Sequence, residues 1–166
     1  MTGPVGELFR DYHASLVRML TRRTGDADRA EEIAQEVFAR AVVAPPRNPR
    51  PWLFAVALNL VREEGRRDVR QQRRLMLYKA EQPAAFEAPD DAMERGDRQA
   101  LVRAALDQLS ARDRDALLLK AEGFSYDDIA ATLGLARGAV GTTLSRARQK
   151  LVEAYRAGEG RHDIAS

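Results

Sequence analysis

The sequence contains no cysteine and only two histidines in its 166 residues. A chain without cysteine can form neither a disulfide nor a thiolate metal site, and His13 and His162 lie too far apart in the sequence to suggest an imidazole zinc site. Nucleophile motifs and glycine-rich phosphate loops are also missing from the sequence. We therefore expect a protein without a metal or a cofactor and without enzymatic activity.

Long apolar runs are lacking as well. No stretch approaches the roughly 20 apolar residues that a membrane span needs. The N-terminal segment MTGPVGELFRDYH has neither the basic end nor the apolar run of a signal peptide. The sequence therefore predicts a cytoplasmic protein that does not insert into a membrane.

Aromatic residues make up only 6% of the chain, and β-branched residues are sparse beside alanine, arginine and leucine. This composition favours helices over sheets, so we expect an all-α protein. A chain of this length forms one medium domain or two small ones. We expect two small helical domains.

Residues 124–151 predict two short helices joined by a tight turn. Ser125 is placed to cap the first helix, and Asp128 follows three residues later, as in a capping box. Gly134 can adopt the left-handed conformation that ends a helix. A second helix begins near Arg137 and turns Val140 inward. The spacing is typical of a helix-turn-helix, which places its second helix in the major groove of DNA.

Three further helices are predicted in the N-terminal half. Apolar residues recur at helical spacing in residues 7–24 and again in residues 26–43, where Asp28 and Glu31 stand in capping-box relation. The prolines of residues 44–51 interrupt the pattern. The next helix starts at Trp52; its polar Asn59 lies among apolar neighbours, so the amide either bonds within the core or faces a ligand.

Charge is distributed in blocks, although the net charge is only +2. Residues 62–74 hold six arginines against three acids, and residues 137–150 hold four basic residues and no acid. Residues 81–97 hold six acids and one arginine. The basic blocks are either solvated helix faces or surfaces that bind phosphates, and the acidic block is expected to be a linker.

Several motifs occur in an order that resembles a bacterial RNA polymerase sigma factor of the extracytoplasmic-function (ECF) type, which carries only sigma regions 2 and 4. The motifs are the DxAEEIxQEVF run at 28–38, Trp52-Leu53-Phe54 with Ala57 and Asn59, LSARDRDALLL at 109–119, GFSYDDIAATLGL at 123–135, and finally Gly138, Val140, Leu144, Arg146, Ala147 and Arg148. The resemblance implies a region 2-like domain at 1–74, an acidic linker at 75–97, a four-helix region 4-like domain at 98–156 containing the helix-turn-helix, and a flexible tail at 157–166.

The resemblance also implies a role for particular residues in a promoter-specificity subunit that is nucleoid-associated when active. The β′ coiled coil of core RNA polymerase would be bound by Glu32, Gln35 and Glu36. Melted minus-10 DNA would be bound by Trp52, Asn59, Arg62, Arg66 and Arg67. Duplex minus-35 DNA would be bound by Arg137, Thr142, Thr143, Arg146 and Arg148, on a domain that also packs against the β flap. An anti-sigma factor is an expected further partner.

The sequence departs from the family pattern in the second helix of the helix-turn-helix. Gly141, Thr142 and Thr143 stand where the family commonly carries basic residues. Two other interpretations therefore stay open: a stand-alone helix-turn-helix regulator that binds duplex DNA as a dimer, and a protein-interaction module that has lost DNA binding. Trp52 likewise is either a core aromatic or a surface on which a base stacks.

Overall fold

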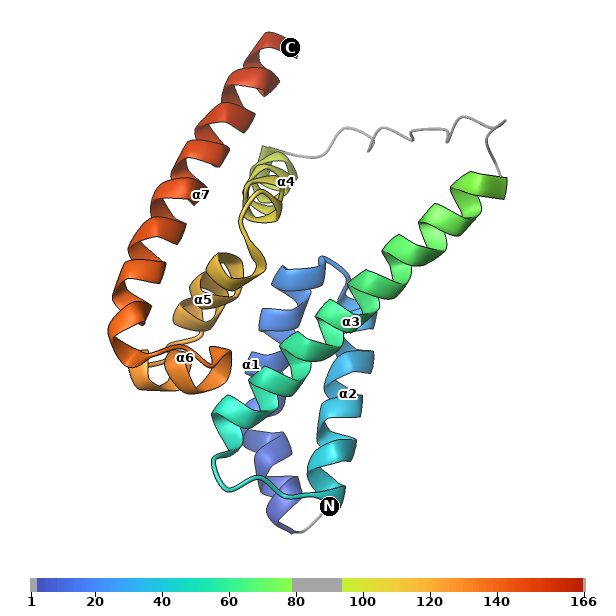
Figure 1. The fold of residues 1–166 in the computed structure, drawn as a ribbon, viewed down its shortest axis with the longest axis vertical. Helices are drawn as coiled ribbons and strands as arrows, with labels where there is room; N and C mark the ends of the chain where they lie inside the picture. The colour runs from blue at the N-terminus through green and yellow to red at the C-terminus, as the bar shows by residue number, and fades with distance from the viewer. Residues whose placement is uncertain (1–2, 79–93, 166) are drawn as a thin grey trace.

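The computed structural model describes residues 3–78 and 94–165, and in these residues it forms seven helices and no strand (Figure 1). The all-α prediction is confirmed. No helix in the described ranges combines the length and the apolar character that a bilayer crossing requires.

Three helices make up the N-terminal domain: α1 (Pro4–Thr24), α2 (Ala27–Val43) and α3 (Pro49–Tyr78). Gly25, at a φ of 71°, ends α1 in the left-handed conformation. The Asp26 carboxylate then caps α2 by accepting hydrogen bonds from the backbone amides of Asp28 and Arg29. The cap therefore lies two residues before Asp28, the predicted one. The apolar faces of the three helices form one core, whose larger buried members are Leu16, Met19, Leu20, Ile33, Val37, Phe38, Leu53, Phe54 and Leu58.

Four helices make up the C-terminal domain, as predicted: α4 (Glu94–Asp107), α5 (Ala111–Ala121), α6 (Tyr126–Leu133) and α7 (Arg137–Ala165). The helix-turn-helix is α6 and the first part of α7. The Ser125 hydroxyl accepts the Asp128 amide at 3.1 Å, and Gly134 ends α6 at a φ of 66°. Both local signals that were read from the sequence are confirmed.

The C-terminal segment differs from its prediction. Residues 157–165 continue α7 as helix, where a flexible tail is expected. The reason is packing, because α4 runs along this part of α7 (Figure 1) and a Cβ at Gly158 would stand 3.4 Å from the Leu101 side chain. The neighbouring helix thus supports a segment whose own sequence, with two glycines, favours helix poorly.

The predicted acidic linker, 75–97, lies mostly outside the described residues. Its first residues extend α3 to Tyr78, and α4 begins at Glu94. The two domains themselves pack together, with α5 against α1 and α6 against α3 (Figure 1). This arrangement, on which the sequence is silent, decides which of the predicted site residues are accessible.

Candidate polymerase and nucleic-acid interfaces

The acidic face of α2 carries the three residues predicted to bind polymerase. Glu32, Gln35 and Glu36 are all exposed, and their spacing of three and four residues puts them side by side on the helix. The opposite face packs Ile33 and Val37 into the core. The amphipathic pattern of α2 therefore fixes a solvent-facing surface with two carboxylates and one amide.

Trp52 lies in the first turns of α3, beside the C-terminal end of α2. Its ring is half-buried and packs against the core of the N-terminal domain. The exposed part lines a shallow groove together with Glu36, Ala39, Arg40 and Val43 of α2 and with Ala44, its C-cap. Trp52 thus combines both alternatives that the sequence leaves open, since one part of the ring is core and the other is accessible.

Asn59 is exposed on α3, and its side-chain amide forms no hydrogen bond with any other residue in the described ranges. The core hydrogen bond that the sequence allows is therefore not made. Seven residues are close to two helical turns, so Trp52, Asn59 and Arg66 follow one another along the same side of α3. We call Trp52, Asn59 and Arg66 the α3 row.

The predicted minus-10 arginines have different surroundings. Arg66 and Arg67 are exposed and have no ion pair with the described part of the chain. Arg62 instead donates to the Asp115 carboxylate of α5 at 2.6 Å, across the boundary between the domains. The structure therefore separates Arg62, which is engaged in an ion pair, from Arg66 and Arg67, which are not.

Two buried carboxylates of α5 and its C-cap hold arginines of the N-terminal domain. Asp115, whose side chain is 0% exposed, accepts from Arg23 at 3.1 Å as well as from Arg62. Glu122, 3% exposed, accepts two hydrogen bonds from Arg18 at 2.8 and 3.1 Å to one oxygen and a third at 3.1 Å to the other. We call this set the interdomain clasp; it comprises Asp115, Glu122, Arg18, Arg22, Arg23 and Arg62.

An aromatic contact lies beside the interdomain clasp. The Phe54 ring of α3 meets the Phe124 ring, which precedes α6, with centroids 4.7 Å apart in an edge-on geometry. The Arg50 guanidinium lies 4.1 Å over the Phe124 ring and donates to the Glu122 carbonyl at 2.8 Å. Apolar and ionic contacts together hold the helix-turn-helix against α3.

The predicted minus-35 residues of α7 divide into accessible and structural ones. Arg137, Thr142 and Arg148 are exposed, and Arg137 pairs with Asp127. Thr143 differs from its prediction, because it is 5% exposed and its hydroxyl bonds to the Ala139 carbonyl at 2.8 Å. Arg146 is half-exposed and donates to Asp113 at 2.8 Å.

Asp113 links α5 to α7. Its side chain is 1% exposed and pairs with Arg146 and, at 3.5 Å, with Lys150. The hydrogen bond from Arg146 lowers the pKa of Asp113 below its usual value, assisted by the charges of Arg146 and Lys150 and opposed by burial. Arg146 is therefore placed to stabilise the domain as well as to face a ligand.

The lowered pKa of Asp113 predicts a loss of stability in acid. A carboxylate with a folded pKa below its unfolded value of about 3.9 contributes its full stability above that value and loses it as the pH falls through the folded pKa. Asp113→Asn should lower the free energy of unfolding by about 1–3 kcal/mol at pH 7. The difference from wild type should shrink on acidification, which urea denaturation over a pH series would measure.

The control for this prediction is Asp127→Asn. Asp127 pairs with Arg137, but both side chains are more than two-thirds exposed, so the change should be small. An Asp113→Asn deficit that stays constant from neutral pH to strong acid would contradict the assignment.

The sequence analysis misses the buried carboxylates of the interdomain clasp. Asp115 and Glu122 are seven residues apart, so the Glu122 side chain at the C-cap continues the face of α5 that buries Asp115, Leu118 and Leu119. An acid within an apolar stripe is a signal that sequence analysis can use. It indicates a buried carboxylate, which needs a basic or hydrogen-bonding partner. Within the described residues, no group of histidine and acidic side chains converges into a metal site.

Comparison with known proteins identifies the family. Residues 8–74 match Sigma-70 region 2, and residues 99–151 match Sigma-70, region 4. The chain is 37% identical over 138 residues to the ECF RNA polymerase sigma factor EcfG of Rhodopseudomonas palustris (strain TIE-1), covering 77% of this chain and 72% of that one. The chain belongs to the ECF sigma factors. A second relative, the ECF RNA polymerase sigma factor SigL of Mycobacterium tuberculosis, is 36% identical over 154 residues, covering 87% of this sigma factor and 84% of SigL.

Two solved structures resemble the sigma factor along most of its length. The sigma factor RpoE of Bartonella quintana, in complex with the anti-sigma factor NepR, gives a TM-score of 0.60 at 27% identity and covers 91% of this chain and 96% of its own. CnrH, in complex with the cytosolic domain of CnrY, gives a TM-score of 0.65 at 26% identity, with 92% and 88% covered. The sigma factor is thus a promoter-specificity subunit for transcription initiation, and neither alternative from the sequence gains support.

Proposed function

We propose that this sigma factor contacts core polymerase through the acidic face of α2 and melted minus-10 DNA through the α3 row. The observation that supports this is the adjacency of the two surfaces: the exposed Glu36, one of the acids of the α2 face, lines the same groove as the accessible part of Trp52. Polymerase bound to α2 would therefore deliver the DNA strands directly to α3.

The chemistry of the α3 row suits a single strand. An exposed aromatic surface stacks on an extruded base, a contact worth about 1–3 kcal/mol per base. The Asn59 amide can read a base edge, and Arg66 with Arg67 can neutralise phosphates. Arg62 would join them only after it leaves Asp115, so the closed arrangement of the domains withholds one of the proposed contacts.

At the minus-35 element, the exposed residues of α7 would make the contacts. Arg137 and Arg148 suit phosphates, and the exposed Thr142 is a further polar contact. Arg146 would contribute a phosphate contact from its half-exposed position, while buried Thr143 would position the helix. The β flap of polymerase is proposed as the partner of the same domain.

We also propose an anti-sigma factor as a partner. The support is the similarity to RpoE, which was solved bound to the anti-sigma factor NepR, across nine-tenths of this chain. An anti-sigma factor would compete with polymerase or with promoter DNA for this chain.

The proposed function predicts that two variants fail in different ways. Glu32→Lys, which reverses a charge on the α2 face, should weaken co-elution with core polymerase at least about tenfold and abolish promoter-dependent run-off transcription. Asn59→Ala should leave co-elution unchanged and reduce open-complex formation by about tenfold or more, as measured by permanganate reactivity of unpaired thymines. Both positions are exposed, so folding should be unaffected.

The wild-type protein provides the control for both measurements. A wild type that neither co-elutes with core polymerase nor supports a promoter-dependent transcript would contradict the proposal as a whole. Loss of polymerase binding in Asn59→Ala would contradict the division between the α2 face and the α3 row.

A further inference from the structure

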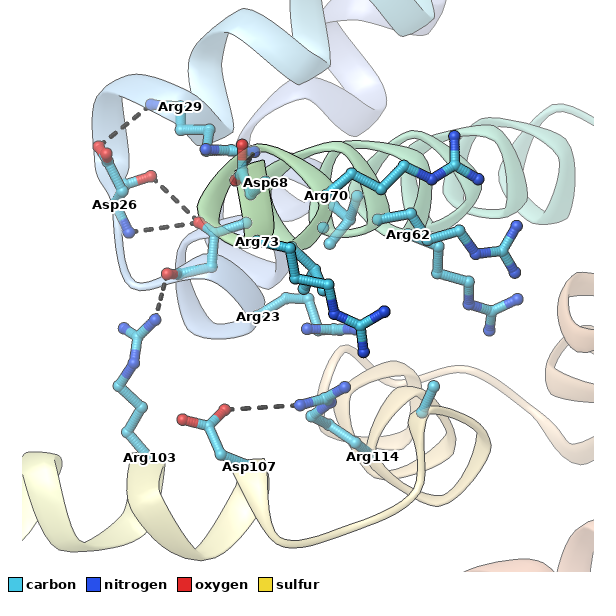
Figure 2. Close-up of a pocket in the computed structure, with 16 residues that line it drawn as sticks. Arg23, Asp26, Arg29, Arg62, Asp68, Arg70, Arg73, Arg103, Asp107 and Arg114 are labelled. Atoms are coloured by element: carbon cyan, nitrogen blue, oxygen red, sulfur yellow. Dashed lines mark hydrogen bonds and ion pairs between the residues drawn. The ribbon is translucent and has the colours of Figure 1, made fainter. Parts of the chain in front are cut away.

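A cleft of about 860 Å³ opens between the two domains (Figure 2). The C-terminal half of α3 forms one wall, and α4 with α5 forms the other. Half of the lining residues are arginines, and the other charged ones are three aspartates. The arginines are Arg23, Arg29, Arg62, Arg66, Arg70, Arg73, Arg103 and Arg114, and the aspartates are Asp26, Asp68 and Asp107.

Ion pairs neutralise only part of this charge. Arg29 pairs with Asp68 and with Glu64, and Arg114 pairs with Asp107 at 3.5 Å. Arg23 and Arg62 share the single carboxylate of Asp115. Even when Glu64 and Asp115 are counted with the lining aspartates, five acids face eight arginines. The cleft therefore carries an excess of positive charge.

The excess is concentrated on α3. Arg66, Arg70 and Arg73 follow at intervals of four and three residues, which places them on one face of the helix, and all three line the cleft. None of their side chains has a hydrogen bond or an ion pair with the described part of the chain. From Arg66 to Arg73 the helix rises about 10 Å, so the row presents three guanidinium groups along that length.

Each wall also holds one buried donor that lacks an acceptor. The Nε atoms of Arg114 and of Arg62 are buried and have no partner within the described ranges. Burial lowers the pKa of Arg114, and the charges of Arg23 and Arg62 lower it further, against the opposing effect of Asp115 and Asp107. Donors without acceptors and like charges at close range both oppose closure of the two walls. An anion between the walls would offset both effects.

We propose that this cleft binds a compact oligophosphate, either inorganic or the phosphate chain of a nucleotide, which bridges the two domains. Guanidinium groups bind phosphate oxygens in forked pairs, and several linked phosphates match several arginines in a row. The volume lies within the range of about 300–1,000 Å³ that is typical of small-molecule sites. The proposal does not depend on the promoter contacts suggested above.

Binding at this position would favour the closed arrangement of the domains. A ligand held by both walls binds the closed form better than an open one and shifts the population toward it. Because Arg62 and Arg66 belong to the same wall, the ligand would also compete with DNA for them.

Isothermal titration calorimetry of the full chain with inorganic tripolyphosphate tests the proposal. At about 150 mM salt we expect one site, and we expect Arg73→Ala to weaken binding at least about tenfold, which corresponds to 1.4 kcal/mol. Arg74→Ala is the matched control: it removes the same charge from the next residue of α3, but Arg74 does not line the cleft. Its affinity should stay within about twofold of wild type. Both side chains are exposed, so neither change should affect folding.

Further arms of the titration separate the possible sources of phosphate. Equal affinity for ATP and tripolyphosphate would show that the phosphate chain alone is recognised, and tighter binding of ATP would show that a nucleoside adds contacts. An equal loss of affinity in Arg73→Ala and Arg74→Ala would overturn the proposal. Binding of a glutamate oligomer as tightly as tripolyphosphate would overturn it too. Either result would mean that the cleft attracts anions without specificity. Absence of binding at about 150 mM salt would overturn it as well.

Discussion

Asp115→Ala is expected to separate the two domains. Its carboxylate is fully buried and holds both Arg23 and Arg62, so its removal leaves two arginines facing each other without a counter-charge. Breaking a buried ion pair from one side costs about 3–5 kcal/mol. Because both arginines belong to the other domain, the cost falls on the closed arrangement and opening relieves it. The radius of gyration from small-angle X-ray scattering should rise.

The same variant should bind single-stranded minus-10 oligonucleotides more tightly, because Arg62 is released to the solvent. Fluorescence anisotropy with a labelled strand measures this gain. Asp127→Ala is the matched control, because it also removes one carboxylate. The Asp127 side chain is 69% exposed and lies outside the interdomain clasp. If Asp115→Ala kept the radius of gyration of wild type, the interdomain clasp would not be what holds the domains together.

Phe54→Ala is expected to cost about 3–5 kcal/mol of folding free energy, a large part of the roughly 5–15 kcal/mol that stabilises a typical domain. The ring is 0% exposed, belongs to the core of the N-terminal domain, and also meets Phe124 of the other domain. Its removal leaves a cavity that two packed helices cannot easily fill. Urea denaturation followed by circular dichroism measures the loss.

Val43→Ala provides the comparison for Phe54→Ala. Val43 is 86% exposed at the end of α2, so its truncation should change stability by less than about 0.5 kcal/mol. A loss below about 1 kcal/mol in Phe54→Ala would contradict the placement of this ring in the core.

Local signals in the sequence predict much of the fold. Ser125 and Gly134 bound α6 because a cap and a left-handed glycine act within a few residues of themselves. The helical continuation of α7 to Ala165 could not be predicted in this way, because it depends on α4, which lies some 60 residues earlier in the chain. The interdomain clasp is equally distant: Arg18 and Glu122 are 104 residues apart, and any of the 27 basic residues could have paired with that acid.

Exposure of the site residues is predicted correctly where the helical pattern is regular. Exposure of Glu32, Gln35 and Glu36 follows from the amphipathic pattern of α2, and the sequence predicts it. The prediction that Thr143 faces DNA is wrong, since the side chain is buried. The sequence holds a signal for this, because Thr143 stands within the inward stripe of Val140, Leu144 and Ala147.

The buried carboxylate of Asp115 has a consequence for promoter choice if Arg62 contacts minus-10 DNA as proposed. Asp115 is tethered to the arginine that it holds, so it would compete with DNA as an intramolecular ligand, for which effective concentrations are typically in the millimolar range. Dilution of the protein does not weaken such a competitor. A promoter would then have to supply enough binding free energy at its other contacts to displace Asp115 from Arg62, and sites that match poorly would be rejected before the strands open.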